Sequence, residues 1–311
     1  STRFCLFVYL TYFFSMSSYD SEGNESWYSK ELSININLTL TGISLDNSAV
    51  NENSEIETQI GILSSIDNDT EDTHTYTLVS GDVYGDNSSF TITGDTLLNG
   101  EVFNFESKSS YSIRIQSEDS NEEVFSKSFT INIGDVNELP TDITLSSLTI
   151  DENESIGTEI GTLSSTDVDT TDTHVYSLVS GDGDTDNSSF TITGNKLLSG
   201  EVFDFETKSS YSIRVQTNDG NGGTFSKSIT ITINDSNESP TEISLSRLTI
   251  DENTIATTEV GTLSSTDVDT NDTHAYSLVS GDGDTDNSSF TINGNKLLSG
   301  EVFDFETKSS Y

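Results

Sequence analysis

Residues 135–140 read Asp-Val-Asn-Glu-Leu-Pro, and residues 235–240 repeat them as Asp-Ser-Asn-Glu-Ser-Pro. Pro140 and Pro240 are the only prolines in the chain. Proline fixes its own φ and pushes the preceding residue towards an extended conformation. A lone proline after a run of alternating apolar and polar residues therefore indicates the end of a strand. The carboxylate and amide oxygens before each proline are hard ligands of the type that Ca²⁺ prefers. We interpret the two stretches as linkers between domains that can also hold a metal ion.

The chain repeats at a fixed spacing from about Thr41 onward. Asn-Glu-Asn at 51–53 recurs as Asp-Glu-Asn at 151–153 and 251–253, which gives a period of 151 − 51 = 100 residues. A repeat of this length is typical of an independent β-sandwich and too long for a solenoid unit. We predict a first repeat over 41–140, a second over 141–240, and a third over 241–311 that stops before its last two strands.

Residues 1–40 fit this repeat least well. The apolar run from Phe4 to Phe14 follows Arg3 and resembles the core of a signal peptide. Alternatively, Glu-Gly-Asn at 22–24 matches Asp-Gly-Asn at 219–221, which favours a diverged remnant of a preceding repeat. The second interpretation accounts for more residues. In either case, the linker hexapeptide is missing before the first repeat.

The composition is strongly acidic. Twelve Lys and Arg stand against 53 Asp and Glu in 311 residues, giving a formal net charge of −41. Such a charge repels nucleic acid phosphates and calls for local neutralisation, for which divalent cations are the simplest candidates. Cys5 is the only cysteine, which excludes an intrachain disulfide. No run approaches the roughly 18 apolar residues of a transmembrane segment.

Acidic and weakly apolar chains are often disordered, but here the apolar residues fall in period-two runs that favour folded strands. Tyr211, Ile213 and Val215, for example, alternate with polar residues. The fold class predicted is all-β, with tandem immunoglobulin-like Greek-key sandwiches of about seven strands per complete repeat. In the second repeat, we expect strands near residues 143–150, 158–165, 174–179, 189–193, 196–198, 211–217 and 225–234.

Acidic motifs follow or precede these strands. Because strand ends of a sandwich gather at two poles, the motifs of the second repeat separate into two groups. One group, beside the outgoing linker, consists of Glu152, Asp204 and Glu206. The other, beside the incoming linker, consists of Asp167, Asp169 and Asp219. We therefore expect carboxylates from both neighbouring repeats around each linker. The alternative is that these residues are solvated loop acids.

In their order, these motifs resemble those of cadherin repeats, and most closely the cadherin-like tandem repeats of large bacterial surface proteins. Asp-Glu-Asn at 151–153 resembles the Pro-Glu-Asn motif, and Asp-Val-Asp at 167–169 resembles Asp-x-Asp. Phe-Asp-Phe-Glu at 203–206 resembles Leu-Asp-Arg-Glu, and Asp219 ends a segment that resembles Ala-x-Asp. The linkers resemble Asp-x-Asn-Asp-Asn-x-Pro.

The resemblance implies Ca²⁺ bound between successive repeats. Around the first linker, the implied ligands are Glu52, Glu106, Asn137, Glu138, Asp167, Asp169 and Asp219. Around the second linker, they are Glu152, Asp204, Glu206, Asn237, Glu238, Asp267 and Asp269. Asn104 departs from the family's Asp, and each linker is one residue shorter before its proline. These departures leave open the number of ions per linker.

The resemblance also implies a non-enzymatic, calcium-dependent stalk or adhesion array at the cell surface or outside the cell, within a membrane-associated parent protein. The expected partners are neighbouring repeats of the same chain, and other surface proteins or glycans, with homophilic contact left open. The alternative is a carbohydrate-binding or spacer module of a larger secreted enzyme. The acidic loop at 182–186 resembles the start of an EF-hand, although it lacks the Gly and the closing Glu, which favours a surface loop.

Overall fold

The computed structural model describes residues 12–14, 18–19, 21–26, 32–34, 39–69, 72–80 and 85–311. Most of the apolar run predicted as signal-like, and Cys5 with it, lies outside the described residues. The chain separates into two compact units, Ser1–Glu138 and Leu139–Tyr311. Among the described residues, no helix has the length and apolar character needed to cross a membrane.

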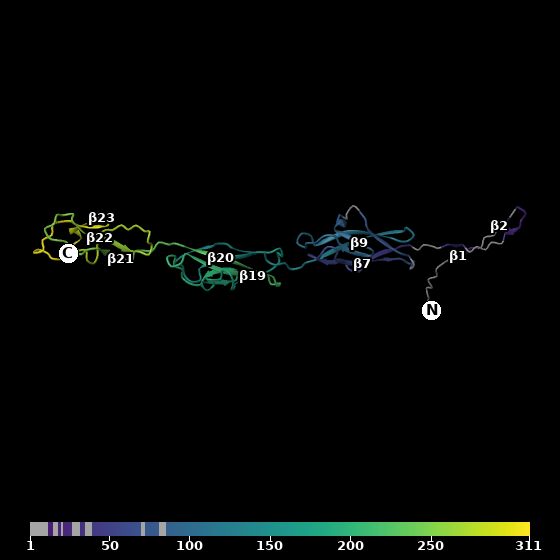
Figure 1. The fold of residues 1–311 in the computed structure, drawn as a ribbon, viewed down its shortest axis with the longest axis horizontal. Coiled ribbons are helices and arrows are strands. Elements are labelled where there is room, and N and C mark those ends of the chain that lie inside the picture. Colours follow the sequence, from purple (N-terminus) through teal and green to yellow (C-terminus); the bar gives the residue numbers. More distant parts are fainter. Residues whose placement is uncertain are drawn as a thin grey trace. The chain divides into compact units, whose positions relative to one another are not determined.

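The second repeat is a sandwich of two four-stranded sheets (Figure 1). One sheet has the order β13-β15-β18-β17, and the other has the order β14-β20-β19-β16. The strands are β13 Asp142–Leu145, β14 Thr149–Asp151, β15 Glu159–Thr166, β16 Val175–Leu178, β17 Phe190–Thr193, β18 Lys196–Ser199, β19 Ser210–Asn218 and β20 Thr224–Asn234, with a 3₁₀ turn η2 at Asn187–Ser189.

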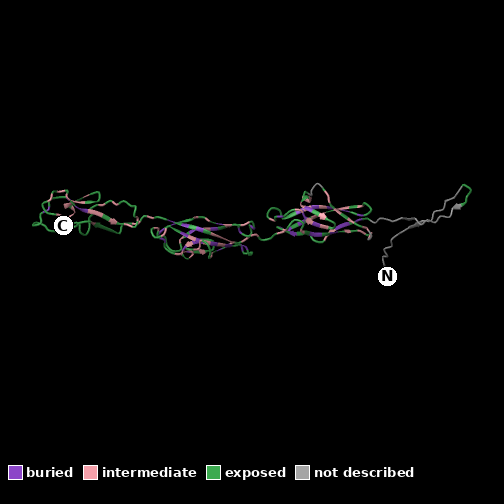
Figure 2. Ribbon diagram, in the orientation of Figure 1, coloured by how far each residue is buried: buried purple, intermediate pink, exposed green. Residues whose placement is uncertain are grey.

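The period-two pattern places one side of each long strand in the core. In β19, Tyr211, Ile213 and Val215 are buried, while the residues between them are partly exposed. Opposite them across the antiparallel ladder, β20 contributes Ile229 and Ile231. Figure 2 shows the resulting buried stripes along the strands of the repeat. The predicted all-β sandwich is confirmed in this repeat.

Aromatic rings close the core at one end. Phe203 is 1% exposed, and its ring centroid lies 5.3 Å from that of Phe190 and 4.7 Å from that of Tyr211. Edge-to-face and tilted pairs at these separations add stability beyond the burial of apolar area. The loop that carries Asp204 and Glu206 therefore begins from a fixed, buried anchor.

The predicted strand 143–150 is wrong as a single element. β13 pairs antiparallel with β15, whereas β14 pairs parallel with β20 in the opposite sheet. Residues 146–148 carry the chain from one sheet to the other. Because apolar residues on both sides of this crossing point inward, the alternation alone does not reveal it.

A tight turn at Gly194 and Asn195 joins β17 to β18. β17 and β18 pair antiparallel, and Gly194 has φ +63°. A positive φ costs glycine nothing, because it has no Cβ. Gly94 and Gly294 have φ values of +63° and +61° at the same position of the other repeats.

The first repeat has the same plan. Its sheets are β5-β7-β10-β9 and β6-β12-β11-β8. The strands are β5 Gly42–Leu45, β6 Ala49–Asn51, β7 Gln59–Ile66, β8 Thr75–Leu78, β9 Phe90–Thr93, β10 Thr96–Asn99, β11 Ser110–Glu118 and β12 Val124–Gly134, with η1 at Asn87–Ser89. Its core uses the same positions as that of the second repeat, except that Tyr76 and Phe129 are only partly buried where Tyr176 and Ile229 are buried.

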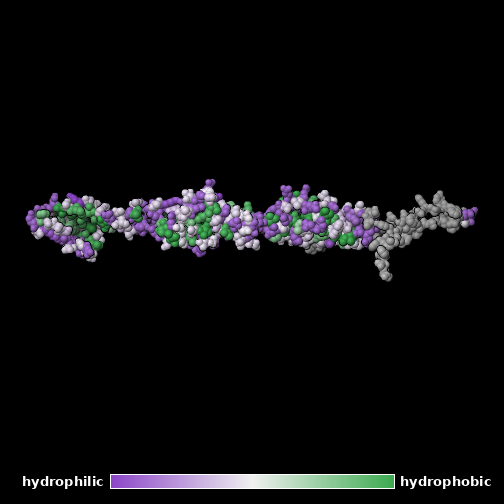
Figure 3. Space-filling view, turned by 90° about the horizontal axis from the view of Figure 1, so that it is seen from below, coloured by the Kyte–Doolittle hydropathy of each residue, from purple (hydrophilic) through white to green (hydrophobic). Residues whose placement is uncertain are grey.

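The third repeat consists of a single sheet in the described residues, with the order β21-β22-β24-β23. Its strands are β21 Glu242–Leu245, β22 Glu259–Thr266, β23 Phe290–Asn293 and β24 Lys296–Ser299, with η3 at Asn287–Ser289. Ile243 is 66% exposed, whereas its counterpart Ile143 is fully buried. Figure 3 shows apolar side chains lining a hollow on this repeat. Residues 249–251 and 275–278, the counterparts of β14 and β16, form no strand.

Before the first repeat, short strands form two antiparallel pairs. β1 Tyr12–Phe14 pairs with β4 Leu32–Ile34, and β2 Ser18–Tyr19 pairs with β3 Glu25–Ser26. Gly23 in the intervening turn has φ +85°, close to the +87° of Gly220 in the turn between β19 and β20. This likeness is in line with the predicted remnant of a preceding repeat, and the assignment of residues 1–40 stays a prediction.

Candidate metal centre

Glu152 is the best-shielded carboxylate beside the second linker. It follows β14 and is 4% exposed. Its Oε2 accepts a hydrogen bond from the backbone N–H of Phe205 over 2.7 Å, and its Oε1 accepts one from Ser236 over 2.8 Å. A buried charge needs such partners, because its desolvation is otherwise too costly. Glu152 thus fixes the aromatic loop and the linker to the end of β14.

Glu52 makes the equivalent contacts in the first repeat, where it is 2% exposed. Its two oxygens accept hydrogen bonds from the backbone N–H groups of Phe105 over 2.8 Å and of Val136 over 2.9 Å. In both complete repeats, a buried Glu thus accepts one backbone hydrogen bond from the aromatic loop and one from the linker.

Two groups of carboxylates gather around these glutamates. Oxygens of Glu152, Asp204 and Glu206 lie within 4.8 Å of one another. In the first repeat, the corresponding group consists of Glu52, Glu106 and Asp135. Like charges this close repel one another, and a bound cation would reverse that repulsion. The predicted grouping of Glu152, Asp204 and Glu206 at one pole agrees with this geometry.

The linker glutamate is held by the Asp-Glu-Asn motif. Asn153 has φ +62°, and its side-chain amide donates a hydrogen bond to Oε1 of Glu238. The other oxygen, Oε2, is buried and has no hydrogen-bond partner. A buried carboxylate oxygen without a donor is costly in the absence of a cation. Asn53 holds Glu138 in the same way in the first repeat.

The opposite pole of the second repeat carries a further group. Oxygens of Asp167, Asp172 and Asp219 lie within 4.8 Å of one another, and Asp219 is 1% exposed. Oδ1 of Asp219 accepts hydrogen bonds from the backbone N–H groups of Asn221 and Gly223 over 2.8 and 2.9 Å. Asp169 is also buried in this region. The three residues predicted for this pole therefore lie at the end of the sandwich, as expected.

Asp172 is a member of this group that the sequence analysis missed. Its Oδ1 accepts a hydrogen bond from the side-chain amide of Asn221 over 2.7 Å, while its Oδ2 is buried without a partner. The signal was present in the sequence, because aspartate recurs at positions 72, 172 and 272. The sequence alone does not show that Asp172 turns towards Asp219, because that placement depends on tertiary contacts such as the bond from Asn221.

The first repeat has the corresponding group Asp67, Asp72 and Asp119. Asp119 is 6% exposed, and its Oδ1 accepts the backbone N–H groups of Asn121 and Glu123 over 2.9 and 2.8 Å. This pole is built in the same way, although the hexapeptide is absent from the sequence before it.

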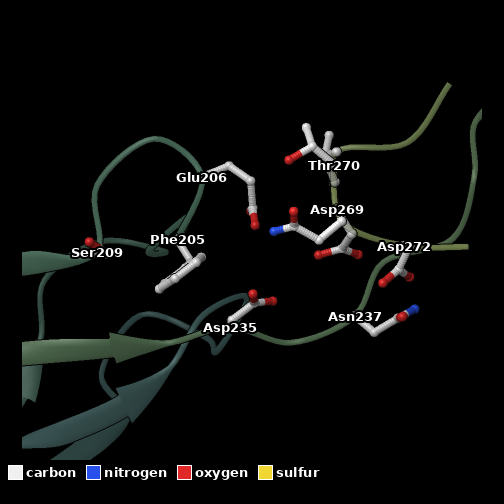
Figure 4. A pocket seen from close by; sticks show the side chains of 10 residues that line it. Phe205, Glu206, Ser209, Asp235, Asn237, Asp269, Thr270 and Asp272 are labelled. Carbon is white, nitrogen blue, oxygen red and sulfur yellow. The ribbon is translucent and has the colours of Figure 1, made fainter.

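Within the second unit, the linker at residues 235–240 contacts the third repeat. The backbone N–H of Glu238 donates to Oδ2 of Asp269 over 2.7 Å. A pocket here is lined by Glu206, Asp235, Asn237, Asp269 and Asp272, together with Phe205, Ser209, Val268, Thr270 and Asn271. Figure 4 shows the carboxylates of Glu206, Asp235 and Asp269 turned towards the same space. Asp235 and Asp272 were not among the predicted ligands.

The electrostatics of this pocket favour a cation. Loss of water and the neighbouring charge of Glu152 raise the pKa of Glu206. Desolvation, followed by the charges of Asp269 and Glu152, raises the pKa of Asp235. The pKa of Glu238 is also raised, by desolvation and then by Glu152. A raised carboxyl pKa means that the ionised form is disfavoured where it stands.

The residues present fit Ca²⁺. Carboxylate and amide oxygens line the pocket of the second unit, without a histidine or cysteine donor. Oε2 of Glu238, in the same linker, is buried without a partner. Oxygen-only sites with several carboxylates suit hard cations, and the flexible coordination number of Ca²⁺ tolerates irregular geometry better than Mg²⁺ does.

The residues predicted around the first linker belong to both units. Glu52, Glu106 and Glu138 are contributed by the first unit, and Asp167, Asp169 and Asp219 by the second. Each unit brings its own members together, as described above. Asn137 donates its side-chain amide to the carbonyl of Glu138 over 2.9 Å, and Asn237 makes the same bond to Glu238 over 2.7 Å.

The loop at 182–186 is arranged differently from an EF-hand. Arg214 and Ser228 donate hydrogen bonds to the carbonyl of Asp182 over 3.0 and 2.5 Å. Asp186 forms an ion pair with Lys208 and accepts the backbone N–H of Ser212 over 2.7 Å. Lys208 thus neutralises Asp186, one of the carboxylates that a calcium loop would offer, which favours the surface-loop interpretation.

Residues 146–234 match the family model of the cadherin domain. The second repeat is a cadherin domain. The match covers most of the sandwich and includes the Asp-Glu-Asn, Asp-Val-Asp and Phe-Asp-Phe-Glu motifs. The resemblance to cadherin repeats is therefore confirmed. A closest relationship to bacterial cadherin-like repeats stays a prediction.

Solved cadherin structures are similar in fold to this chain. Mouse cadherin-23 EC22-24 is 18% identical with a TM-score of 0.58, and the match covers 86% of this chain and 90% of that one. The protocadherin gammaB4 extracellular domain is 19% identical, with a TM-score of 0.58 and coverage of 94% and 54%. Protocadherin gamma B2 extracellular cadherin domains 3–6 are 17% identical, with a TM-score of 0.57 and coverage of 86% and 66%.

The chain spans less than two thirds of the length of these two protocadherin structures. At this level of identity, the likeness establishes tandem cadherin-like sandwiches as the fold. A comparison with curated proteins finds no match.

Proposed function

We propose that this chain is part of a calcium-dependent extracellular stalk or adhesion array, in which Ca²⁺ at the linkers stiffens consecutive cadherin repeats. The observation that carries the proposal is the pocket of the second linker, where Glu206, Asp235 and Asp269 face one space and the pKa values of the first two are raised. The ligands proposed there are Glu152, Asp204, Glu206, Asp235, Asn237, Glu238, Asp267, Asp269 and Asp272.

The physical role of the ion follows from the charges. Without a cation, carboxylates of the second repeat and of the third repel each other across the linker, as the raised pKa of Asp235 beside Asp269 indicates. A bound Ca²⁺ is attracted to both sets, so it replaces repulsion across the joint with attraction. The joint is therefore expected to be rigid with calcium and to bend without it.

Solvated loop acids account less well for these residues. Glu152 and Asp219 are almost completely buried, and Oε2 of Glu238 is buried without a donor. Acids that merely keep a surface hydrated are expected to stay exposed. The first linker carries the same residue types in sequence, so we extend the proposal to Glu52, Glu106, Asn137, Glu138, Asp167, Asp169 and Asp219.

The test compares thermal unfolding and solution scattering of the 311-residue chain in EDTA and in millimolar CaCl₂. Calcium at about one hundred times its Kd should stabilise the folded chain by about 2.7 kcal/mol per site that binds only the native state. The melting temperature should rise, and the distribution of scattering-derived lengths should narrow towards its longest values. If neither quantity changes on calcium addition, the proposal is wrong.

A matched pair of variants assigns the effect to the linker. D235N/E238Q/D269N removes two charges from the second linker and one from the third repeat beside it, and should lose much of the calcium-induced rise in melting temperature. E201Q removes one charge from an exposed residue of the same repeat and should retain the rise. Equal responses of the two variants would place calcium elsewhere.

Binding partners belong to the proposal as well. The chain would contact neighbouring repeats through its linkers and other surface proteins through the sandwich faces. A glycan-binding module would need exposed aromatic rings. Among the described residues, Phe305 and Tyr311 are the exposed large aromatic side chains, and both lie in the third repeat. The adhesive role is therefore preferred to the carbohydrate-binding one, and a catalytic role is not proposed.

A further inference from the structure

Each repeat contains one histidine whose ring contacts the first aspartate of the Asp-x-Asp motif. Nε2 of His174 lies 3.1 Å from Oδ2 of Asp167. The corresponding distances are 3.2 Å for His74 and Asp67, and 2.8 Å for His274 and Asp267. The same side chains thus meet in all three repeats, including the third, in which the facing sheet is absent from the described residues.

The contact is well shielded from water. The side chain of Asp167 is 3% exposed and that of His174 is 16% exposed. A hydrogen bond in such surroundings is stronger than one in water, because the local dielectric is lower. The histidine therefore restricts the rotation of the carboxylate.

The other oxygen of the carboxylate is held too. Oδ1 of Asp167 lies 3.3 Å from the backbone N–H of Asp169, and Oδ1 of Asp267 lies at the same distance from that of Asp269. Each carboxylate is thus fixed from two sides. In the second repeat, the carboxylate so fixed lies within 4.8 Å of those of Asp172 and Asp219.

We propose that His174 and His274 are positioning residues for calcium: each holds the carboxylate of Asp167 or Asp267 so that its remaining lone pairs face the ion at the linker. This inference rests on the proposed function. A ring N–H at Nε2 that donates to the carboxylate sets the orientation of that carboxylate. Outer-shell partners of this kind typically change metal affinity by about 10- to 100-fold when they are removed.

His74 provides a control inside the molecule. It makes the same contact with Asp67 and is about equally shielded, at 15% exposure. Before the first repeat, the sequence keeps Asn37 at the position of Asn137, but Leu38 replaces the linker Glu and Asn35 replaces Asp135, so this pole lacks the incoming carboxylates. Replacement of His74 should lower the stability of the fold as much as replacement of His174 does. It should not lower the affinity for calcium to the same extent.

The experiment uses the full chain at pH 8 and measures the calcium affinity of the linker sites by titration calorimetry, and the melting temperature in EDTA. H174L/H274L should bind calcium about 10- to 100-fold more weakly than the parent chain. H174Q/H274Q should recover most of the affinity, because the amide of Gln carries an N–H near the position of Nε2. H74L should retain the parent's affinity.

The melting temperature in EDTA measures the structural cost separately. H74L and the other histidine variants should lower it by a similar amount for each histidine replaced. A parental calcium affinity in H174L/H274L, or an equal loss of affinity in H74L, would overturn the positioning role. If the Leu variant does not fold, H174Q/H274Q and H174N/H274N give the same comparison, since Asn is too short to donate from that position.

The same measurements separate this inference from the proposed function. If the parent chain itself shows no calcium binding, the proposed function fails. If the parent binds calcium and H174L/H274L binds it equally well, only the positioning role fails.

Discussion

The backbone N–H of Glu238 donates a hydrogen bond to Oδ2 of Asp269 over 2.7 Å, and so joins the second linker to the Asp-x-Asp motif of the third repeat. This bond satisfies one carboxylate oxygen, but it also brings Asp269 close to the negative side chains of Glu238 and Asp235. The joint thus combines an attractive backbone contact with repulsion between side chains, and the balance between the two depends on a cation.

Replacement of Glu238 by Gln should separate these contributions. Desolvation and the charge of Glu152 raise the pKa of Glu238, so its stabilising contribution is present at low pH and is lost as pH rises through that pKa. At pH 7, E238Q should therefore keep or raise the melting temperature in EDTA, while the calcium-induced rise should shrink. Gln can still accept the hydrogen bond from Asn153.

E201Q is the control for this prediction, because Glu201 is exposed in the same repeat. E201Q should change neither the melting temperature in EDTA nor its rise on addition of calcium. A marked loss of melting temperature in EDTA for E238Q, together with a parental calcium response, would contradict the electrostatic interpretation of the linker.

Glu152 should matter to the fold even without calcium. E152A leaves the backbone N–H groups of Phe205 and Ser236 without their acceptor. An unsatisfied buried group costs about 1–3 kcal/mol, so the second repeat should lose about 2–4 kcal/mol. Hydrogen exchange in EDTA should show the amides of residues 205 and 236 losing protection.

E252A provides the comparison. Glu252 is exposed, and its Oε2 accepts the backbone N–H of Phe305 over 2.9 Å. This substitution should therefore cost less than E152A. Equal losses of stability would show that burial of Glu152 contributes nothing to its role.

The fold could be predicted from the sequence wherever the alternation of apolar and polar residues matches the burial of the side chains. Tyr211, Ile213 and Val215 predict an inward face because every second residue is apolar, and β19 has that pattern of burial. The crossing between β13 and β14 could not be predicted in this way. It depends on which strand each segment pairs with, and β15 and β20 lie far away in the sequence.

The candidate site was predictable to a similar extent. Glu152, Asp204 and Glu206 were placed together because their motifs follow strand ends at one pole, and the three side chains do converge. Asp172 was missed because the turn that brings it beside Asp219 is set by tertiary contacts, including the hydrogen bond from Asn221. The contacts of His174 with Asp167 were missed for the same reason.

Truncation of two isoleucines at equivalent positions should destabilise the protein to very different extents. Ile143 is fully buried in the core of the second repeat, whereas Ile243 is 66% exposed. I143A removes buried methyl groups and leaves a cavity, at a cost of about 2–5 kcal/mol. I243A should change stability by about 0.5 kcal/mol or less, as exposed substitutions usually do.

Chemical denaturation of both variants, followed by circular dichroism, checks this prediction. The two strands are similar in sequence, DITL and EISL, and the substitution is the same, so a large difference in the loss of stability is attributed mainly to the facing sheet. A loss for I243A as large as that for I143A would mean that the apolar face of the third repeat is covered in solution.

The last prediction concerns acid and Asp186, which lies away from the linkers. Burial alone would raise the pKa of Asp186, but the hydrogen bonds from Lys208 and Ser212 outweigh it and leave the pKa lowered. A lowered folded-state pKa gives stability that is fully present above the unfolded pKa of about 3.9 and is lost as pH falls through the folded value. Because Lys208 is 41% exposed, solvent screening limits the contribution to about 1 kcal/mol. D186N should therefore be less stable than the parent at pH 7, and the difference should narrow below about pH 4.

Urea unfolding at pH 7 and below pH 4 measures the difference in free energy of unfolding between D186N and the parent. D182N is the exposed control in the same loop. A difference that stays constant with pH would rule out the charge of Asp186 as its source, because only a titrating group loses its contribution in acid.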